Sequence, residues 1–186
     1  MNYDEAIEYI ETVSCSGIMP GLVRIQALLE KTGHPEKKCN VIHVAGNAHP
    51  AAFNGDPVGT IVGNIDSTYR LLEYAKNHGG KRFLFVSSGE VYGQGDISLD
   101  AFDEKYSGYL DVLSPRSCYP LSKRMAENLC VSYWKQYGFE SVIVRPCHTY
   151  GPLMTASDNR AHAQFLHNVL AGEDIIMKSA GTQMRS

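Results

Sequence analysis

Tyr119 and Lys123 stand four residues apart at the start of a stretch whose apolar residues repeat at helical spacing. On one helix the two side chains would project from the same face, because four residues make slightly more than one turn. An ammonium group close to a phenol favours the phenolate and lowers the pKa of the phenol, which lets tyrosine act as a base near neutral pH. The pair therefore predicts proton transfer, although the same spacing alone is more often a chance pair on a wet helix face.

A serine hydroxyl could complete such a site by holding the oxygen of the substrate. Ser88 closes an apolar segment, residues 82–88, that is typical of a buried strand. In an open α/β sheet the loops after the carboxyl ends of the strands hold the ligand. Three such loops occur along the chain, and they read AGNAHPAAF, SSGEVYGQG and RPCHTYGP.

The elements that must position these loops follow an α/β pattern. The segments that read as strands are 40–46, 82–88 and 141–146, and those that read as helices are 58–79, 119–137 and 159–171. Strands that are apolar throughout indicate a parallel sheet, because both of its faces are covered by helices. We therefore expect an α/β fold with a parallel sheet and helices on both faces.

Composition and charge exclude several classes of function. The 186 residues are 44% apolar and 20% charged, with a net charge of −3 and no clustered basic face for nucleic acid. No apolar run is long enough to cross a bilayer, and the polar, acidic start does not resemble a signal peptide. The five cysteines form no C-x-x-C pair, which favours reduced thiols in the cytoplasm, and the seven histidines show no metal-ligand spacing.

Three strings in order along the chain resemble one enzyme family. SSGEVYG (87–93), YPLSK (119–123) and RPCHTYGP (145–152) are similar to the extended short-chain dehydrogenase/reductases, the NAD-dependent epimerases and dehydratases of nucleotide sugars. The resemblance covers about residues 41–186. It implies an incomplete Rossmann-like sheet, NAD as the ancestral cofactor, a nucleotide-sugar substrate and a homodimer.

The resemblance also implies a role for each matching residue. Tyr119 would take the proton from a sugar hydroxyl while a hydride passes to the nicotinamide. Lys123 would bind the nicotinamide ribose and tune Tyr119, and Ser88 would hydrogen-bond the sugar oxygen. The residues implied in cofactor binding are Ala45, Gly46, Asn64, Ser87, Tyr119, Lys123 and Pro146, and those implied in substrate binding are Ser88, Glu90 and His148.

Within the family, the string SPRSCYPLSKRMAE most resembles UDP-glucuronate decarboxylases. Glu90 matches the second acid/base group of the decarboxylases and 4,6-dehydratases, although it could equally cap the turn after the strand. The dehydratases carry an aspartate immediately before that glutamate, where this chain has Gly89, so dehydration is disfavoured. His148 stands where these subfamilies have an asparagine, which leaves the sugar open.

The glycine-rich loop that holds a dinucleotide pyrophosphate is missing from these 186 residues. Such a loop needs a strand, a glycine turn and a helix N-terminus in direct succession. Gly89, Gly93 and Gly95 belong to the serine loop, and Gly55 and Gly59 do not fit the spacing. We therefore expect weak NAD binding, with turnover that is low or absent.

The first 46 residues resemble a different family, the folylpolyglutamate synthases. The resemblance rests on MNYDEAIEYIE, GLVRIQALLEKTGHPEKK and VIHVAG, but the residues after Gly46 lack the lysine and glycines of that family's phosphate loop. It implies a chimera of a helical segment, 1–40, and a partial NAD-binding domain, 41–186. We expect residues 3–32 to form two amphipathic helices that pack against the sheet without a nucleotide site. The alternatives are a non-catalytic recombined or designed scaffold and a fragment of an ATP-dependent ligase.

Overall fold

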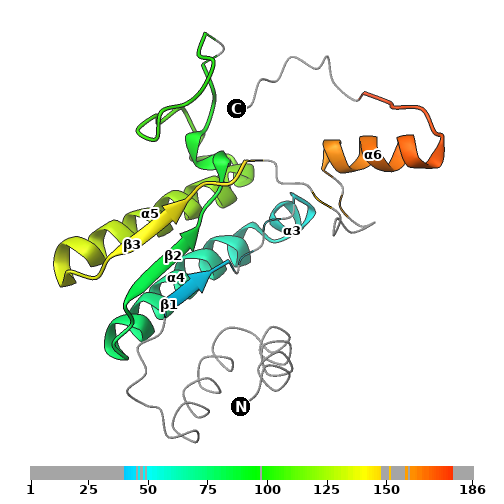
Figure 1. Ribbon diagram of the computed structural model, residues 1–186. Coiled ribbons are helices and arrows are strands. Elements are labelled where there is room, and N and C mark those ends of the chain that lie inside the picture. The colour runs from blue at the N-terminus through cyan, green and yellow to red at the C-terminus, as the bar shows by residue number, and fades with distance from the viewer. Residues whose placement is uncertain are drawn as a thin grey trace, which may run out of the picture.

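The computed structural model describes residues 40–44, 46, 48, 50–96, 98–147, 151, 158 and 160–177. Three parallel strands form one sheet in the order β1-β2-β3 (Figure 1). Their bounds are Asn40–His43 for β1, Arg82–Val86 for β2 and Ser141–Val144 for β3. The predicted parallel sheet is therefore confirmed, and each strand ends two or three residues before the expected position.

In the described residues, four α-helices and two short 3₁₀ turns connect or follow the strands. They are α3 (Pro50–Gly55), α4 (Pro57–Asn77), η1 (Gly89–Tyr92), η2 (Pro115–Ser117), α5 (Cys118–Tyr137) and α6 (Ala161–Ala171). Asp56 starts α4 by accepting a hydrogen bond from the backbone N–H of Gly59 at 2.8 Å, and Pro57 occupies the first helical position. The three predicted helices are confirmed, whereas α3 lies in a segment that was expected to be a loop.

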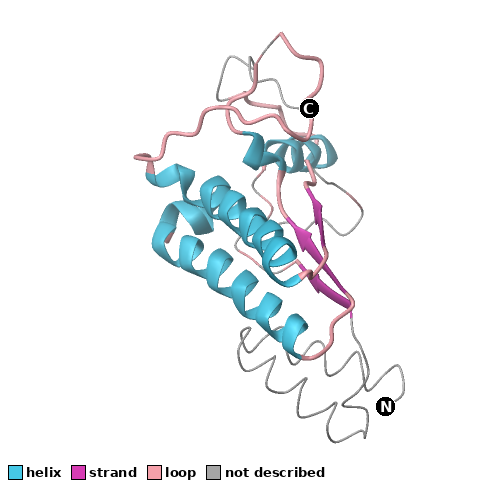
Figure 2. Ribbon diagram, turned by 90° about the vertical axis from the view of Figure 1, so that its left-hand side faces the viewer, coloured by secondary structure: helices cyan, strands magenta, loops and turns pink. Residues whose placement is uncertain are grey.

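The core lies between the sheet and the helices α4 and α5, which run side by side on one face (Figure 2). Phe83 and Phe85 alternate with Leu84 along β2, and their side chains are 0% and 1% exposed. They pack among residues of both helices: Leu72, Ala75, Ala126, Cys130 and Tyr133. A strand with period-two alternation thus places both phenylalanines in the core.

The opposite face of the sheet is apolar and exposed. It carries Ile42, Val44, Val142 and Val144, whose side chains are 66%, 64%, 48% and 37% exposed. Successive right-handed crossovers that step the same way across a sheet place their helices on one face. The described helices that pack on the sheet therefore cover one of the two expected faces, and the helices predicted within residues 3–32 lie outside the described residues.

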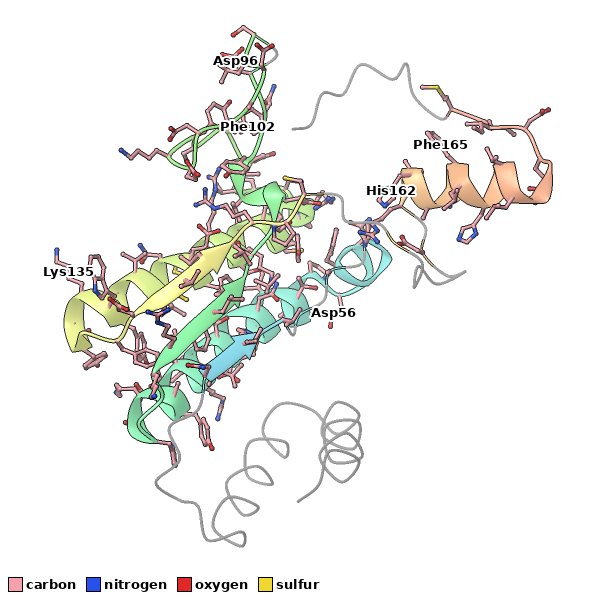
Figure 3. The ribbon with its side chains drawn as sticks, viewed as in Figure 1. Asp56, Asp96, Phe102, Lys135, His162 and Phe165 are labelled. Carbon is pink, nitrogen blue, oxygen red and sulfur yellow. The ribbon has the colours of Figure 1, made fainter. Side chains whose placement is uncertain are left out.

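The loop between η1 and η2 extends away from the sheet, with Asp96 and Phe102 in its outer part (Figure 3). Phe102 stacks on Tyr106 at 4.6 Å between ring centres and contacts Tyr92 at 5.4 Å. Arg124 of α5 donates to the backbone oxygens of Val91 at 2.6 Å and Gly108 at 2.9 Å. These contacts fix the base of the loop to the helix that carries Tyr119.

Membrane-spanning helices and metal clusters are both absent from the described part of the chain. None of the helices there combines the length and the apolar character that crossing a bilayer requires. Among the same residues, no three His, Cys, Asp or Glu side chains gather as a metal site would need.

Candidate active site

Tyr119, Ser88 and Glu90 come together at the carboxyl end of β2. Tyr119 lies in the first turn of α5, and its side chain is 6% exposed. Burial raises the pKa of the Tyr119 phenol above its ordinary value, while a hydrogen bond with the Ser88 side chain acts in the opposite direction. The structure thus brings the phenol to the serine hydroxyl, as the order of the loops predicted.

Lys123 is buried one turn after Tyr119 on α5, and its ammonium donates a hydrogen bond to the main chain and not to the phenol oxygen. Its Nζ donates to the backbone oxygen of Val86 at 3.1 Å and lies 4.9 Å from the centre of the Phe85 ring. The distance from Nζ to the centre of the Tyr119 ring is 5.9 Å. Burial lowers the pKa of the Lys123 ammonium to about 8, and the charge of Glu127 acts against this shift.

The expectation that Lys123 lowers the pKa of Tyr119 is therefore wrong for this structure. The pKa of the phenol is raised instead. Desolvation of the buried phenolate raises it more than the Ser88 hydrogen bond and the Arg116 charge lower it. Only the arrangement of Tyr119 and Lys123 on one helix face agrees with the prediction.

Gly46, Asn64 and Lys123 form the next layer of the site. A methyl group on Gly46 would lie 2.6 Å from Asn64 Oδ1 and 3.5 Å from Lys123 Nζ, so the backbone approaches both side chains closely. The Asn64 amide donates to Ser122 Oγ at 2.9 Å, and Ser122 donates to the backbone oxygen of Tyr119 at 3.0 Å. Asn64 is thereby linked to the turn that carries Tyr119.

Asn64 Oδ1 of this layer and Ser87 Oγ, directly after β2, are buried and have no hydrogen-bond partner among the described residues. Burying a polar atom without a partner is costly, and such atoms in a native structure need an explanation. A polar ligand at this edge of the sheet would supply partners for both. The residues present therefore fit the nicotinamide end of a dinucleotide.

The loop after β3 lies against the serine loop. The Gly89 backbone N–H donates to the Pro146 carbonyl oxygen at 3.0 Å. A methyl group on Gly89 would lie 2.5 Å from Cys147 Sγ, so a side chain at position 89 would require the exposed Cys147 side chain to move. The two remaining predicted residues, Ala45 and His148, lie outside the described residues.

Glu90 is paired with a residue that the sequence analysis did not single out. Arg116 Nη2 donates to both carboxylate oxygens of Glu90 at 3.1 Å. The turn after β2 is capped instead by Ser88 Oγ, which accepts from the Glu90 N–H at 3.2 Å. The interpretation of the Glu90 carboxylate as a turn cap is therefore wrong, because that carboxylate faces Arg116.

Phe53 of α3 completes the site and was also missed. Its ring stacks on the Tyr119 ring at 4.9 Å between centres, and the Arg116 guanidinium carbon lies 4.5 Å from the centre of the Phe53 ring. Cys118 Sγ donates to the Phe53 carbonyl oxygen at 3.5 Å. The string PRSCY offered a signal for Arg116, since that arginine precedes Tyr119 by three residues, but nothing in the local sequence indicated Phe53.

We predict that charge changes at Glu90 and Arg116 move the pKa of Tyr119 in opposite directions. The Glu90 charge raises that pKa and the Arg116 charge lowers it. Glu90→Gln should therefore lower the pKa of Tyr119, and Arg116→Gln should raise it. NMR titration of ring-labelled tyrosine, assigned with Tyr119→Phe, measures both shifts. Glu140→Gln, an exposed change at the far end of the sheet, should leave the titration unmoved, and equal shifts in all three variants would contradict the prediction.

His43, next to this site, is a buried histidine at the end of β1. Its Nε2 lies 3.1 Å from Thr68 Oγ1 and 3.2 Å from Ser67 Oγ. Burial lowers the pKa of His43 from 6.5 to about 4, and the charge of Lys123 adds to this effect. The imidazole is therefore neutral in the folded chain at physiological pH.

This histidine should make the fold sensitive to acid. Because the pKa of His43 is lower in the folded state, the unfolded state binds the proton first, and stability falls as the pH drops from 6.5 to about 4. A shift of this size corresponds to about 3 kcal/mol of unfolding free energy. His43→Gln should flatten that dependence in urea titrations repeated across this range, whereas His78→Gln, at an exposed position, should keep it. If the unfolding free energy of His43→Gln fell with pH as steeply as that of the parent chain, His43 would not be the source of the acid sensitivity.

Comparison with known proteins identifies related sequences and folds. Residues 20–186 match the NAD dependent epimerase/dehydratase family. UDP-glucuronic acid decarboxylase 5 of Arabidopsis thaliana is 38% identical over 146 residues, and UDP-glucuronic acid decarboxylase 1 of Xenopus tropicalis is 34% identical over 146. Each alignment covers 78% of this chain, which spans 42% and 34% of the lengths of these two relatives.

Solved structures agree with the sequence matches. UDP-glucose 4-epimerase of Thermotoga maritima, solved with UDP-glucose, gives a TM-score of 0.70 at 26% sequence identity. The alignment covers 86% of this chain and 48% of the epimerase chain. RMD from Pseudomonas aeruginosa, solved with NADPH, gives a TM-score of 0.60 at 31% identity, with 73% and 44% coverage.

Proposed function

Because the chain belongs to the NAD-dependent epimerase/dehydratase family, we propose that it carries the nicotinamide and sugar end of an active site for a nucleotide sugar. One observation supports this most directly: the buried Tyr119 phenol lies beside the Ser88 side chain at the carboxyl end of β2. Ligands of open parallel sheets bind at that edge. The family membership also agrees with the resemblance inferred from the three strings.

In the proposed reaction, Tyr119 takes a proton from a sugar hydroxyl that Ser88 holds by a hydrogen bond. Glu90, kept in place by Arg116, serves as the second acid/base group. When bound, NAD supplies the hydride acceptor. The residues proposed to hold it are Ala45, Gly46, Asn64, Ser87, Lys123 and Pro146, and His148 is proposed to contact the sugar.

UDP-glucuronate is the proposed substrate, and decarboxylation the proposed outcome. The curated relatives named above are UDP-glucuronic acid decarboxylases, which supports this choice. The sequence supports it as well, because Gly89 stands where a 4,6-dehydratase is expected to carry an aspartate. The acid group needed for loss of water is then missing beside Glu90.

A direct test follows UDP-glucuronate turnover and binding with NAD present. The chain should show a low rate of carbon dioxide release, and Tyr119→Phe should abolish it while Tyr109→Phe, at a 68% exposed position, should not. Binding is read separately from NMR shifts at Ser88 and Glu90 on addition of UDP-glucuronate. Shifts confined to other parts of the chain, or turnover that Tyr119→Phe leaves unchanged, would refute the proposal.

The second proposed function is a non-catalytic scaffold, of recombined or designed origin. Two observations favour it: no glycine-rich pyrophosphate loop occurs in the 186 residues, and Lys123 Nζ is already bonded to the Val86 carbonyl. In this proposal, residues 1–40 form a folylpolyglutamate-synthase-like segment joined to the partial NAD-binding domain. The match to the epimerase/dehydratase family begins at residue 20, inside that segment. The ATP-ligase interpretation has no phosphate loop after Gly46 to support it.

We also propose a cytoplasmic location and a homodimer. The described cysteines, Cys118, Cys130 and Cys147, are free thiols, which agrees with a reducing compartment. Sedimentation at several concentrations would test the homodimer.

A further inference from the structure

We propose that Phe53 is a positioning residue, whose ring fixes the Tyr119 phenol and the Glu90 carboxylate relative to each other by contacting Tyr119 and Arg116. This role rests on the proposed function for Tyr119 and Glu90 and extends it to a residue of α3. Phe53 is 1% exposed, so its ring offers no surface on which a substrate could stack. Any effect of the ring on the reaction must therefore pass through the side chains that it contacts.

Both ring contacts come from one short stretch of the chain. Arg116 in η2 and Tyr119 in the first turn of α5 are three residues apart, a spacing that places side chains on the same side of a helix. The Tyr119 ring stacks on the Phe53 ring with 15° between the two planes. The distance of 4.5 Å from the Arg116 guanidinium carbon to the centre of the Phe53 ring is typical of a cation–π contact. One buried ring thus contacts the proposed base and the partner of the second acid/base group.

The ion pair between Arg116 and Glu90 needs this support. The two side chains are 44% and 25% exposed, and long exposed side chains must give up rotamer freedom to stay paired. Nη2 makes both hydrogen bonds to the carboxylate, so this pair lacks the two-nitrogen fork that strengthens many arginine–carboxylate contacts. A planar guanidinium stacks well on an aromatic face. The Phe53 ring therefore restricts the orientation of Arg116, and Arg116 in turn holds Glu90.

Phe53 is itself fixed from two directions. Its carbonyl oxygen accepts a hydrogen bond from Cys118 Sγ at 3.5 Å, which joins α3 to the first residue of α5. Three residues after Phe53, Asp56 caps the N-terminus of α4. Since α4 and α5 both pack in the main core, the position of the Phe53 ring is set by two helices that are already anchored.

The packing around Phe53 is separate from the main core. Phe53, Cys118 and Tyr119 form a buried apolar cluster of their own, whereas Phe139 belongs to the cluster between the sheet and the helices. A change at Phe53 should therefore disturb the site while the main core keeps its contacts. Phe139→Leu makes the same chemical change in the main core, so it is the matched control for Phe53→Leu.

NMR titration of Tyr119 tests the proposal without NAD or a sugar. Charged groups from three elements lie around Tyr119: Glu90 on η1, Arg116 on η2 and Lys123 on α5. Because the Arg116 charge lowers the pKa of Tyr119, Arg116→Gln should raise that pKa in the parent chain. In Phe53→Leu the guanidinium is no longer oriented, so adding Arg116→Gln should shift the pKa by less than about half as much. In Phe139→Leu the shift should equal that of the parent chain.

Urea denaturation of each variant checks that the titrated chain is folded. If Phe53→Leu does not fold, Phe53→Met takes its place, because the flexible methionine side chain fills the same space without an aromatic face. The same reduction of the Arg116→Gln shift is expected in that variant.

Turnover of UDP-glucuronate provides a second readout that a merely structural role would not move. Phe53→Leu should lower kcat at least about ten-fold and leave KM within about three-fold, because misplaced acid/base groups weaken the transition state and not substrate binding. Phe139→Leu should leave both constants close to those of the parent chain.

Two results of the titration would overturn the proposal. If Arg116→Gln shifts the pKa of Tyr119 equally in the parent chain and in Phe53→Leu, Arg116 holds its place without the ring. If the shift is reduced as much in Phe139→Leu as in Phe53→Leu, the loss comes from general loosening of the fold. Absence of turnover in the parent chain would count against the proposed function alone, since the titration requires neither NAD nor a sugar.

Discussion

Calorimetric titration of this chain with NAD is expected to give a dissociation constant well above the micromolar range. The residues that fit a dinucleotide, such as Asn64, Ser87 and Lys123, lie at the proposed nicotinamide end. The sequence of the 186 residues holds no glycine-rich motif of the kind that binds a pyrophosphate through backbone N–H groups. Charge-assisted hydrogen bonds of that kind are worth roughly 1.5–3 kcal/mol each. Losing two or three of them weakens binding by several powers of ten, at about 1.4 kcal/mol for each power.

A shorter ligand provides the matched control for this expectation. Nicotinamide mononucleotide lacks the adenosine half, so it should bind the chain within about ten-fold of NAD if the adenosine half makes no contact. The double variant Tyr119→Phe, Lys123→Ala should remove whatever binding remains. A dissociation constant in the low micromolar range for NAD, measured on the chain at known oligomeric state, would show that a pyrophosphate site exists.

The architecture was predictable because its pattern is local. The segments around Val41, Phe83 and Val142 are mostly apolar, and helical spacing fills the intervals between them. Such strands favour parallel pairing, and parallel strands with helical crossovers in turn bring their carboxyl ends to one edge. That reasoning correctly placed Ser88 beside the first turn of the helix that carries Tyr119.

The inner contacts of the site were not predictable in the same way, because they depend on tertiary packing. Phe53 reaches Tyr119 only because α3 forms in a segment that resembles a loop. Arg116 reaches Glu90 across 26 residues, through the turn η2 that precedes α5. Neither distance follows from spacing along the chain.

The direction of the Tyr119 pKa shift shows the same limit of local reasoning. Spacing placed Lys123 one turn away and predicted a lowered pKa for the phenol. In the structure Lys123 Nζ turns to the Val86 carbonyl, and the phenol itself is 6% exposed. Burial then sets the direction, and the extent of burial depends on Phe53 and the rest of the fold.

Replacing Phe83 with alanine should cause the largest loss of stability among single changes in the described core. Phe83 is 0% exposed in the middle strand, where it packs against both helices and lies 6.1 Å from His43 between ring centres. Phenylalanine-to-alanine changes in a core cost about 3–5 kcal/mol, because they remove buried apolar area and leave a cavity. That is a large share of the roughly 5–15 kcal/mol that stabilises a typical domain.

Urea denaturation of a graded series measures this loss. Phe83→Leu leaves a smaller cavity and should cost roughly 1–2 kcal/mol, whereas Leu113→Ala, at a position that is 89% exposed, should stay within about 0.5 kcal/mol of the parent chain. The order of the three variants follows from the structure even if the alanine variant is too unstable to give a full transition. A loss below about 1 kcal/mol for Phe83→Ala would mean that the sheet and the two helices do not form one packed core. In that case the strand β2 would not hold Ser88 against Tyr119, and the candidate site would lose its structural basis.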